Sequence, residues 1–162
     1  MTIYLIDANV LIRADADYYP ITRFQPFWDW LFQKALSRTV QMPREIFDEV
    51  AKSNDLLGKW LNTSDVKKAI ILPEGTNAQT VSKVICEGYA NNLNDIEIEK
   101  IGRDPFLISA ALSGADRVVV TREISKPSAQ RGNRKIPDIC ASFGIQCIND
   151  FELWRSLDFR IS

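Results

Sequence analysis

The candidate catalytic residues of this chain are acidic. Three of them lie beside apolar runs that are typical of buried strands or helices. Asp7 follows the run 3–6, and Glu123 follows the run 118–121 almost at once. Asp104 stands at the start of a third apolar stretch. In open α/β sheets, ligands bind at the carboxyl ends of the parallel strands. These carboxylates are therefore expected to converge at one edge of a sheet.

A fourth acid is expected from the segment 43–53, which has helical periodicity. Its acidic residues are Glu45, Asp48 and Glu49. At 100° per residue, Glu49 lies about 60° from Ile46, at the edge of the apolar face, whereas Asp48 points toward solvent. Glu45 lies one turn before Glu49 and is the alternative.

The chain contains no histidine, and this narrows the possible chemistry. A Ser-His-Asp triad, a Cys-His pair and a histidine metal site are all excluded. Carboxylates crowded at one edge repel each other unless a cation lies between them. Oxygen ligands without nitrogen or sulfur favour Mg²⁺ or Mn²⁺. A plainer reading makes Asp7 and Asp104 helix N-caps, the latter followed by Pro105, and Glu123 a loop charge.

The elements that must position these acids alternate between apolar runs and amphipathic segments. Parallel strands joined by helical crossovers follow from such alternation. We therefore expect a three-layer, doubly wound (Rossmann-like) α/β fold, with a central parallel sheet flanked by helices, in a single domain over 1–162. The expected strands are 3–6, 40–42, 69–72, 117–121 and 145–148. The expected helices begin at 10 and span 24–36, 43–53 with Pro43 at its first position, 56–61, 79–93, 106–112, 137–143 and 151–157.

Charge and composition limit the partners. The net charge of -1 excludes a global basic field, so nucleic acid would have to bind a local patch. The loop 122–135 offers such a patch for RNA phosphates. No apolar run approaches the roughly 18 residues of a membrane helix, and the N-terminus does not resemble a signal peptide. Three cysteines without CxxC spacing suit a reducing cytoplasm. The expected phosphate-binding cations are Arg122, Lys126, Arg131, Arg134 and Lys135.

Five motifs occur in the order that a known family shows them. They are IYLIDANVLI, MPREIFDEV, DPFLISAAL, ADRVVVTREI and KIPDICASFGIQCINDFELW. Together they resemble the PIN domain, in particular a bacterial subgroup related to VapC-like toxin ribonucleases. The second motif selects Glu49 over Glu45, because the family's acid lies six residues after the Pro or Ser that precedes this helix. Glu123 stands where the commonest pattern has Asp, and 53–94 carries no motif of the family.

The resemblance implies a metal-dependent endoribonuclease that hydrolyses RNA phosphodiesters. Mg²⁺ or Mn²⁺ would be bound by Asp7, Glu49, Asp104 and Glu123, which also form the catalytic set. Asn9 and Thr121 would orient ligands or water around them. The implied biological role is the toxin of a toxin–antitoxin pair, with RNA and an antitoxin protein as partners and a homodimer as a possible assembly.

Two other functions are compatible with the same residues. One is a catalytically silent PIN-fold module that binds a partner protein. The other is a metal-dependent phosphohydrolase with Asp7 as its nucleophile. Such enzymes normally carry a second Asp two positions later, where this chain has Asn9.

Overall fold

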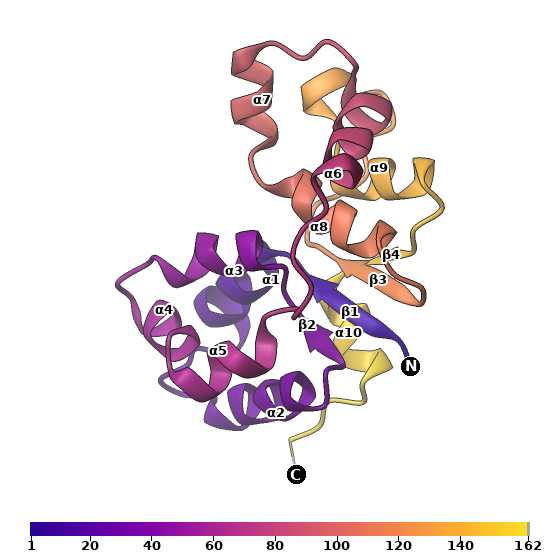
Figure 1. The fold of residues 1–162 in the computed structure, drawn as a ribbon. Coiled ribbons are helices and arrows are strands. Elements are labelled where there is room, and N and C mark those ends of the chain that lie inside the picture. The colour runs from indigo at the N-terminus through magenta and orange to yellow at the C-terminus, as the bar shows by residue number, and fades with distance from the viewer. Residues whose placement is uncertain (162) are drawn as a thin grey trace.

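The computed structural model describes residues 1–161 and contains a four-stranded parallel sheet. Its strand order is β2-β1-β3-β4, so the first strand of the chain lies inside the sheet. Helices flank the sheet, which confirms the α/β architecture expected from the sequence (Figure 1). The strands are β1 (Ile3–Ile6), β2 (Val40–Gln41), β3 (Arg117–Val120) and β4 (Cys147–Ile148).

The register of β1 aligns its end with the end of β3. Ile6 pairs with Val120 across this ladder, and Tyr4 pairs with Val40 of β2 on the other side. The backbone N–H of Asp7 continues the ladder by donating to the carbonyl of Val120 at 2.9 Å. The position of Asp7 is therefore fixed by sheet pairing.

The helices connect the strands and cover the sheet. In Figure 1, α8 lies beside β1 and β3, α2 and α5 lie beside β2, and α10 passes behind the sheet. Short π-helical or 3-10 turns extend or link several of them. The helices are α1 (Ala8–Arg13), α2 (Gln25–Leu36), α3 (Arg44–Ala51), α4 (Leu56–Leu61), α5 (Ser64–Ile70), α6 (Ala78–Lys83), α7 (Asp95–Ile101), α8 (Asp104–Leu112), α9 (Ile136–Ser142) and α10 (Asp150–Ser156), with the turns η1 (Ala14–Tyr18), η2 (Val84–Tyr89) and η3 (Arg131–Asn133).

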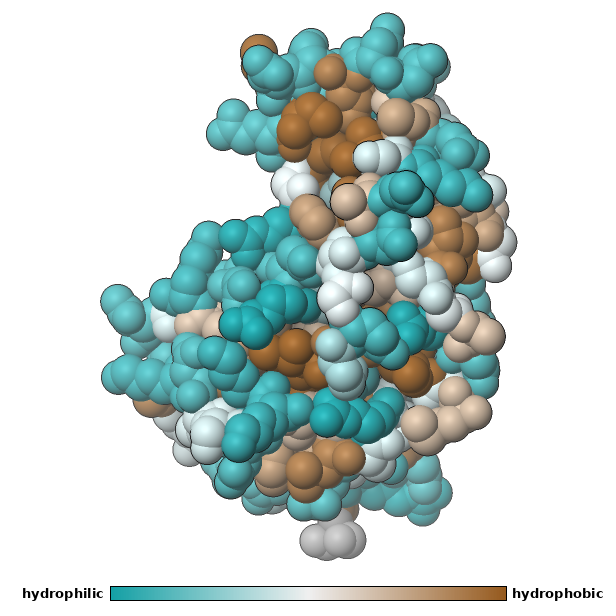
Figure 2. Space-filling model, viewed as in Figure 1, coloured by the Kyte–Doolittle hydropathy of each residue, from teal (hydrophilic) through white to brown (hydrophobic). Residues whose placement is uncertain are grey.

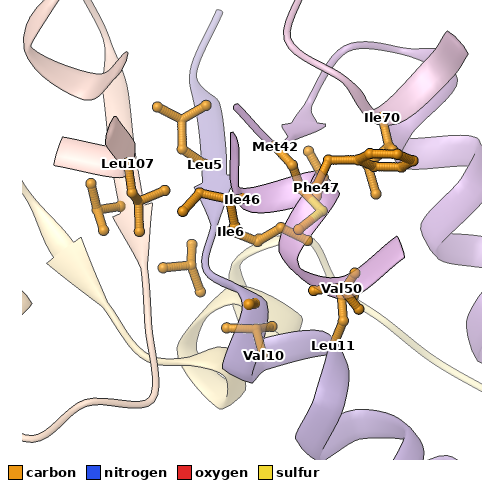
Figure 3. Packing of buried hydrophobic residues seen from close by; sticks show 14 of the residues in the cluster. Leu5, Ile6, Val10, Leu11, Met42, Ile46, Phe47, Val50, Ile70 and Leu107 are labelled. Atoms are coloured by element: carbon orange, nitrogen blue, oxygen red, sulfur yellow. The ribbon is translucent and has the colours of Figure 1, made fainter. Parts of the chain in front are cut away.

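The core forms where β1 meets α3 and α8. Figure 3 shows Leu5 and Ile6 of β1 among Ile46 and Phe47 of α3 and Leu107 of α8. All five side chains are almost fully buried. This packing holds the helices that carry Glu49 and Asp104 against the strand that carries Asp7.

Several elements differ from the sequence-based expectation. The predicted strand 69–72 is wrong, because Ile70 ends helix α5 and only Ile71 makes an isolated bridge, to Met42. The helix predicted over 79–93 begins one residue earlier and ends at Tyr89 in a π-helical turn. Helix α7 was not predicted. Pro43 precedes α3 as its cap residue rather than occupying its first position.

Within residues 1–161, no helix is long and apolar enough to span a membrane. The face shown in Figure 2 is mainly hydrophilic, with separate apolar patches.

Candidate functional site

Asp7 is a buried carboxylate held at the junction of β1 and α1. One oxygen accepts from the Ala8 N–H at 2.8 Å, and the other accepts from Thr121 Oγ1 at 2.8 Å. The pKa of Asp7 is raised to about 6, mainly by burial and in smaller part by the charges of Glu123 and Glu49. The two hydrogen bonds oppose this rise. Asp7 is thus close enough to two other predicted site acids to feel their charge.

Thr121 links Asp7 to the other residues of this junction. Its hydroxyl donates to Asp7 and accepts from Glu123 N–H at 3.1 Å and from Asn9 Nδ2 at 3.4 Å. Asn9 Oδ1 in turn accepts from the Arg122 N–H at 3.1 Å. The structure therefore brings the two predicted orienting residues, Asn9 and Thr121, into one hydrogen-bond network around Asp7.

Asp104 is the first residue of α8 and does not cap it. The cap residue is Arg103, and Pro105 is the second residue of the helix, so the N-cap role expected for Asp104 is wrong. Within residues 1–161, no hydrogen bond reaches the Asp104 carboxylate. The pKa of Asp104 is raised to about 8. Burial is the largest cause, and the charges of Asp7, Glu123 and Glu49 follow in that order. The capping explanation of this acid is therefore removed.

Glu49 and its alternative Glu45 lie in different surroundings. Glu49 is exposed, and its charge raises the pKa of both Asp7 and Asp104. Both carboxylate oxygens of Glu45 instead accept from Thr76 Oγ1, at 2.8 and 2.7 Å. Of these two acids, Glu49 is the one whose charge acts on Asp7 and Asp104, and its carboxylate has no hydrogen-bonded partner within residues 1–161.

The helix that carries Glu49 is tied directly to the helix that carries Asp104. The guanidinium of Arg103 donates to the backbone carbonyl of Glu45 at 2.8 Å. Gly102, with φ of 53°, turns the chain immediately before this contact. Asp48 points away and pairs with Arg44 at 3.5 Å, as expected of a solvated residue.

Glu123 lies where the strand end meets the basic loop. One of its oxygens accepts from the Ile136 N–H at 2.7 Å, at the start of α9. Glu123 lines two cavities, of about 530 Å³ and about 390 Å³. Of the four predicted acids, it is the one that lines both. One carboxylate oxygen therefore fixes the loop to α9, and the other accepts no hydrogen bond within residues 1–161.

The larger cavity is lined by both acidic and basic side chains. They include Asp104 and Glu123 as well as Lys126 and Lys135. Neither lysine forms an ion pair with any residue in 1–161, and the charge of Lys135 lowers the pKa of Asp104 against the larger effect of burial. These two lysines are free to bind an anionic ligand next to the acids.

The three arginines of the same loop are occupied. Arg122 pairs with the buried carboxylate of Asp150 at 2.8 Å, and Arg131 pairs with Glu97 at 2.9 Å. The Arg134 side chain donates to the carbonyl of Gly88 and to Ser142 Oγ, the latter at 3.1 Å. The structure thus separates the five predicted phosphate-binding cations into two free lysines and three arginines that fasten the loop.

Lys100 and Tyr89 are among the residues of the larger cavity that were not predicted from the sequence. Lys100 lines it from α7 and donates to Asn133 Oδ1, and Tyr89 lines it from η2. The capping box formed by Asn94 and Glu97 is a sequence signal that would have revealed α7. Nothing in the sequence near Tyr89 indicates its place.

The donor chemistry suits a hard divalent cation, although the acids are not closed around one. Within residues 1–161, no three Asp, Glu, Cys or His side chains are grouped closely enough to enclose a metal ion. Mg²⁺ usually binds through one or two carboxylates, keeps several waters and is completed by substrate phosphates. Binding through one or two of these acids would fit that mode, whereas a closed structural site formed by all four would not.

Comparison with known proteins places the chain in a family. Residues 4–161 match the family described as a domain of unknown function (DUF4411), and the chain belongs to that family. No curated protein matches the chain.

Proposed function

We propose that this member of the DUF4411 family is a metal-dependent endoribonuclease of the PIN type that hydrolyses RNA phosphodiesters in the cytoplasm. The observation that carries the proposal is the electrostatic effect of Glu49 and Glu123 on the two perturbed acids, Asp7 and Asp104. The charges of Glu49 and Glu123 raise the pKa of both Asp7 and Asp104, although the four come from different segments of the chain. Perturbed acids gathered at the carboxyl ends of parallel strands are typical of functional sites.

Asp7, Glu49, Asp104 and Glu123 would hold the Mg²⁺ or Mn²⁺ ion. When bound, the ion supplies positive charge that activates water and neutralises the phosphate in the transition state. Because a cation favours the ionised carboxylates, Asp104 and Asp7 would lose their protons as it binds.

The chain's own groups would do the positioning. Thr121 holds Asp7 in one orientation, and Glu123 is fixed through Ile136 at the mouth of the basic loop. Lys126 and Lys135 would bind phosphate oxygens of the strand, without reading its sequence. Arg122, Arg131 and Arg134 would support the loop rather than touch RNA.

A cleavage assay tests the proposal. Purified protein should cleave single-stranded RNA with Mg²⁺ or Mn²⁺ and stop when EDTA is added. The same preparation of Asp7→Asn protein should be inactive, which separates this activity from a contaminating nuclease. Cleavage that persists in EDTA and in the variant would contradict the proposal.

A second candidate is a PIN-fold module that binds a partner and cleaves nothing. This candidate is supported by the arrangement of two acids. Glu49 is exposed, and one oxygen of Glu123 already accepts a hydrogen bond from a backbone N–H, so neither is committed to a metal ion. Calorimetric titration with Mn²⁺ distinguishes the two. Binding that is lost in Asp104→Asn supports the nuclease, and an absence of binding supports the module.

The toxin role within a toxin–antitoxin pair is a finer proposal supported by the sequence resemblance. Induced expression should arrest bacterial growth, and Asp7→Asn should relieve the arrest. Co-expression of a small neighbouring reading frame should also relieve it if that frame encodes the antitoxin. Normal growth during wild-type expression would argue against the toxin role while leaving the nuclease activity open.

A further inference from the structure

Tyr89 places a buried hydroxyl without a partner beside the acids. The residue ends η2 and is 6% exposed. Within residues 1–161, its hydroxyl oxygen has no hydrogen-bond partner. A buried polar group in this state carries a desolvation penalty that hydrogen bonding normally offsets. The hydroxyl therefore has an unfilled capacity for one donated hydrogen bond.

The location of this hydroxyl distinguishes it from the others of its kind. Ser109 Oγ and Trp154 Nε1 are also buried without partners in the described part of the chain. Of the three, Tyr89 is the one that lines the cavity of about 530 Å³ that also contains Asp104 and Glu123. The Tyr89 side chain thus borders a space that a ligand can enter, whereas Ser109 lies within helix α8.

The backbone turn that carries Tyr89 is fastened to α9. Gly88 packs so closely on α9 that a Cβ atom there would lie 2.9 Å from Ile139 Cγ2. The Arg134 side chain also donates to the Gly88 carbonyl. These contacts hold the end of η2, and with it the backbone of Tyr89, beside the cavity.

The chemistry of the neighbours defines the ligand. Burial raises the pKa of Tyr89, as do the charges of Asp104 and Glu123, so the phenol stays protonated and acts as a donor. The free cations Lys126 and Lys135 line the same cavity and favour an anionic ligand. A protonated phenol and two ammonium groups on one cavity form a set of donors for phosphate oxygens.

We propose that the Tyr89 hydroxyl donates a hydrogen bond to a non-bridging oxygen of an RNA phosphate bound in this cavity. The inference rests on the proposed ribonuclease function and adds a substrate-positioning residue to it. Tyr89 holds the strand beside Asp104 and Glu123 and takes no part in proton transfer.

The test uses Tyr89→Phe in the full chain, with Ser109→Ala as the matched control. Both variants remove a buried hydroxyl that lacks a partner, but only the first removes one from the cavity. Binding of a single-stranded oligoribonucleotide is measured with Ca²⁺, which neutralises carboxylates and is a larger, more loosely coordinating ion than Mg²⁺. Cleavage is measured with Mn²⁺, and melting is measured in EDTA.

We expect Tyr89→Phe to melt at or above the wild-type temperature, because it removes an unsatisfied group. The same variant should bind the oligonucleotide about tenfold more weakly, the equivalent of about 1.4 kcal/mol, and kcat/KM for cleavage should fall by a similar factor. Ser109→Ala should melt similarly to Tyr89→Phe and bind and cleave as wild type does.

Equal oligonucleotide affinity in Tyr89→Phe and wild type overturns the inference, as does a wild-type protein that binds no oligonucleotide. A lower melting temperature for Tyr89→Phe also overturns it, because the hydroxyl would then already have a partner. If the wild type binds RNA through Tyr89 but cleaves nothing, the ribonuclease proposal fails and phosphate binding by Tyr89 stands.

Discussion

The two junctions that carry the buried acids are built differently. At the β1–α1 junction, Asp7 accepts two hydrogen bonds and Thr121 connects it to Asn9. At the start of α8, Asp104 accepts none within the described chain, and the nearby Tyr89 hydroxyl is also unsatisfied. The pKa values follow this contrast, since burial raises that of Asp7 to about 6 and that of Asp104 to about 8.

This difference separates a preorganised half of the site, around Asp7, from a half in which the carboxylate of Asp104 accepts no hydrogen bond from residues 1–161. Hydrogen bonds to the charged form offset part of the desolvation of Asp7, and Asp104 lacks them. The Asp7 junction is therefore stable without a ligand. The Asp104 side is less favourable in the free protein, so a cation and a phosphate would relieve it on binding.

The largest expected effect is on RNA cleavage, and it follows from replacing the buried acid of either half of the site. Asp7→Asn and Asp104→Asn should each lower RNA cleavage by at least about 100-fold, since even residues that only support metal ligands are worth about 10 to 100-fold. Asp48→Asn, on α3 but outside the cluster, should cleave as wild type does. Initial rates with saturating Mn²⁺ measure this, and an active Asp104→Asn enzyme would confine the site to the Asp7 half.

A smaller effect concerns the lysines beside Asp104. Lys126→Ala with Lys135→Ala should weaken RNA binding for all sequences alike and reduce the salt slope by roughly 1.4, at about 0.7 per phosphate contact on a single strand. Arg131→Ala should change neither quantity, because that side chain pairs with Glu97. Affinities measured over a range of salt concentrations decide this. An unchanged slope in the double variant would mean that the loop does not contact phosphates.

Thr121→Val tests how far preorganisation of the Asp7 junction matters. Valine keeps the shape of the side chain and removes the hydroxyl that donates to Asp7, so cleavage should fall about tenfold. The pKa of Asp7 should also rise above about 6, because one of the hydrogen bonds that lowers it is lost. NMR titration of the carboxyl carbon measures the pKa, and a lower value would contradict this account.

The smallest expected effect is on stability, where Asp104→Asn should stabilise the metal-free protein by about 1 kcal/mol at pH 8 through relief of like-charge crowding and burial. The folded pKa of Asp104 is about 8 and its ordinary value is 3.8, so the native state binds this proton more tightly. The wild-type free energy of unfolding should therefore fall as pH rises through this window.

Melts in EDTA at pH 4 and pH 8 test this dependence. Asp104→Asn and wild type should melt alike at pH 4 and separate at pH 8. Mn²⁺ at a hundredfold excess over Kd should stabilise wild type by about 2.7 kcal/mol and the variant by much less. A variant that melts no higher at pH 8 and gains equally from Mn²⁺ would show that Asp104 is outside the site.

The sequence predicted the elements whose patterns are local. The strand 3–6 and the helix 56–61 have the expected bounds, because apolar runs and turn signals mark their ends. The segment 69–72 failed because Val66, Ala69 and Ile70 form a helical stripe that a four-residue window reads as a strand.

The parts of the site that escaped prediction depend on long-range partners. The ion pair of Arg122 with Asp150, which lies 28 residues away in the chain, was not predicted from the sequence. The unsatisfied hydroxyl of Tyr89 likewise results from packing by η2 and α9, which no local pattern records. The acids were identifiable because the ends of parallel strands meet by topology alone.

The central place of β1 has a consequence for the order of folding. Asp7 and Thr121 are 114 residues apart in the chain, yet they are joined by a hydrogen bond within the candidate site. At about 5–20 residues per second, synthesis of the intervening segment takes on the order of 10 s. During that time β3, which pairs with β1 on the side opposite β2, does not yet exist. A nuclease of this topology would be harmless to the ribosome and message that produce it until most of its chain has been made.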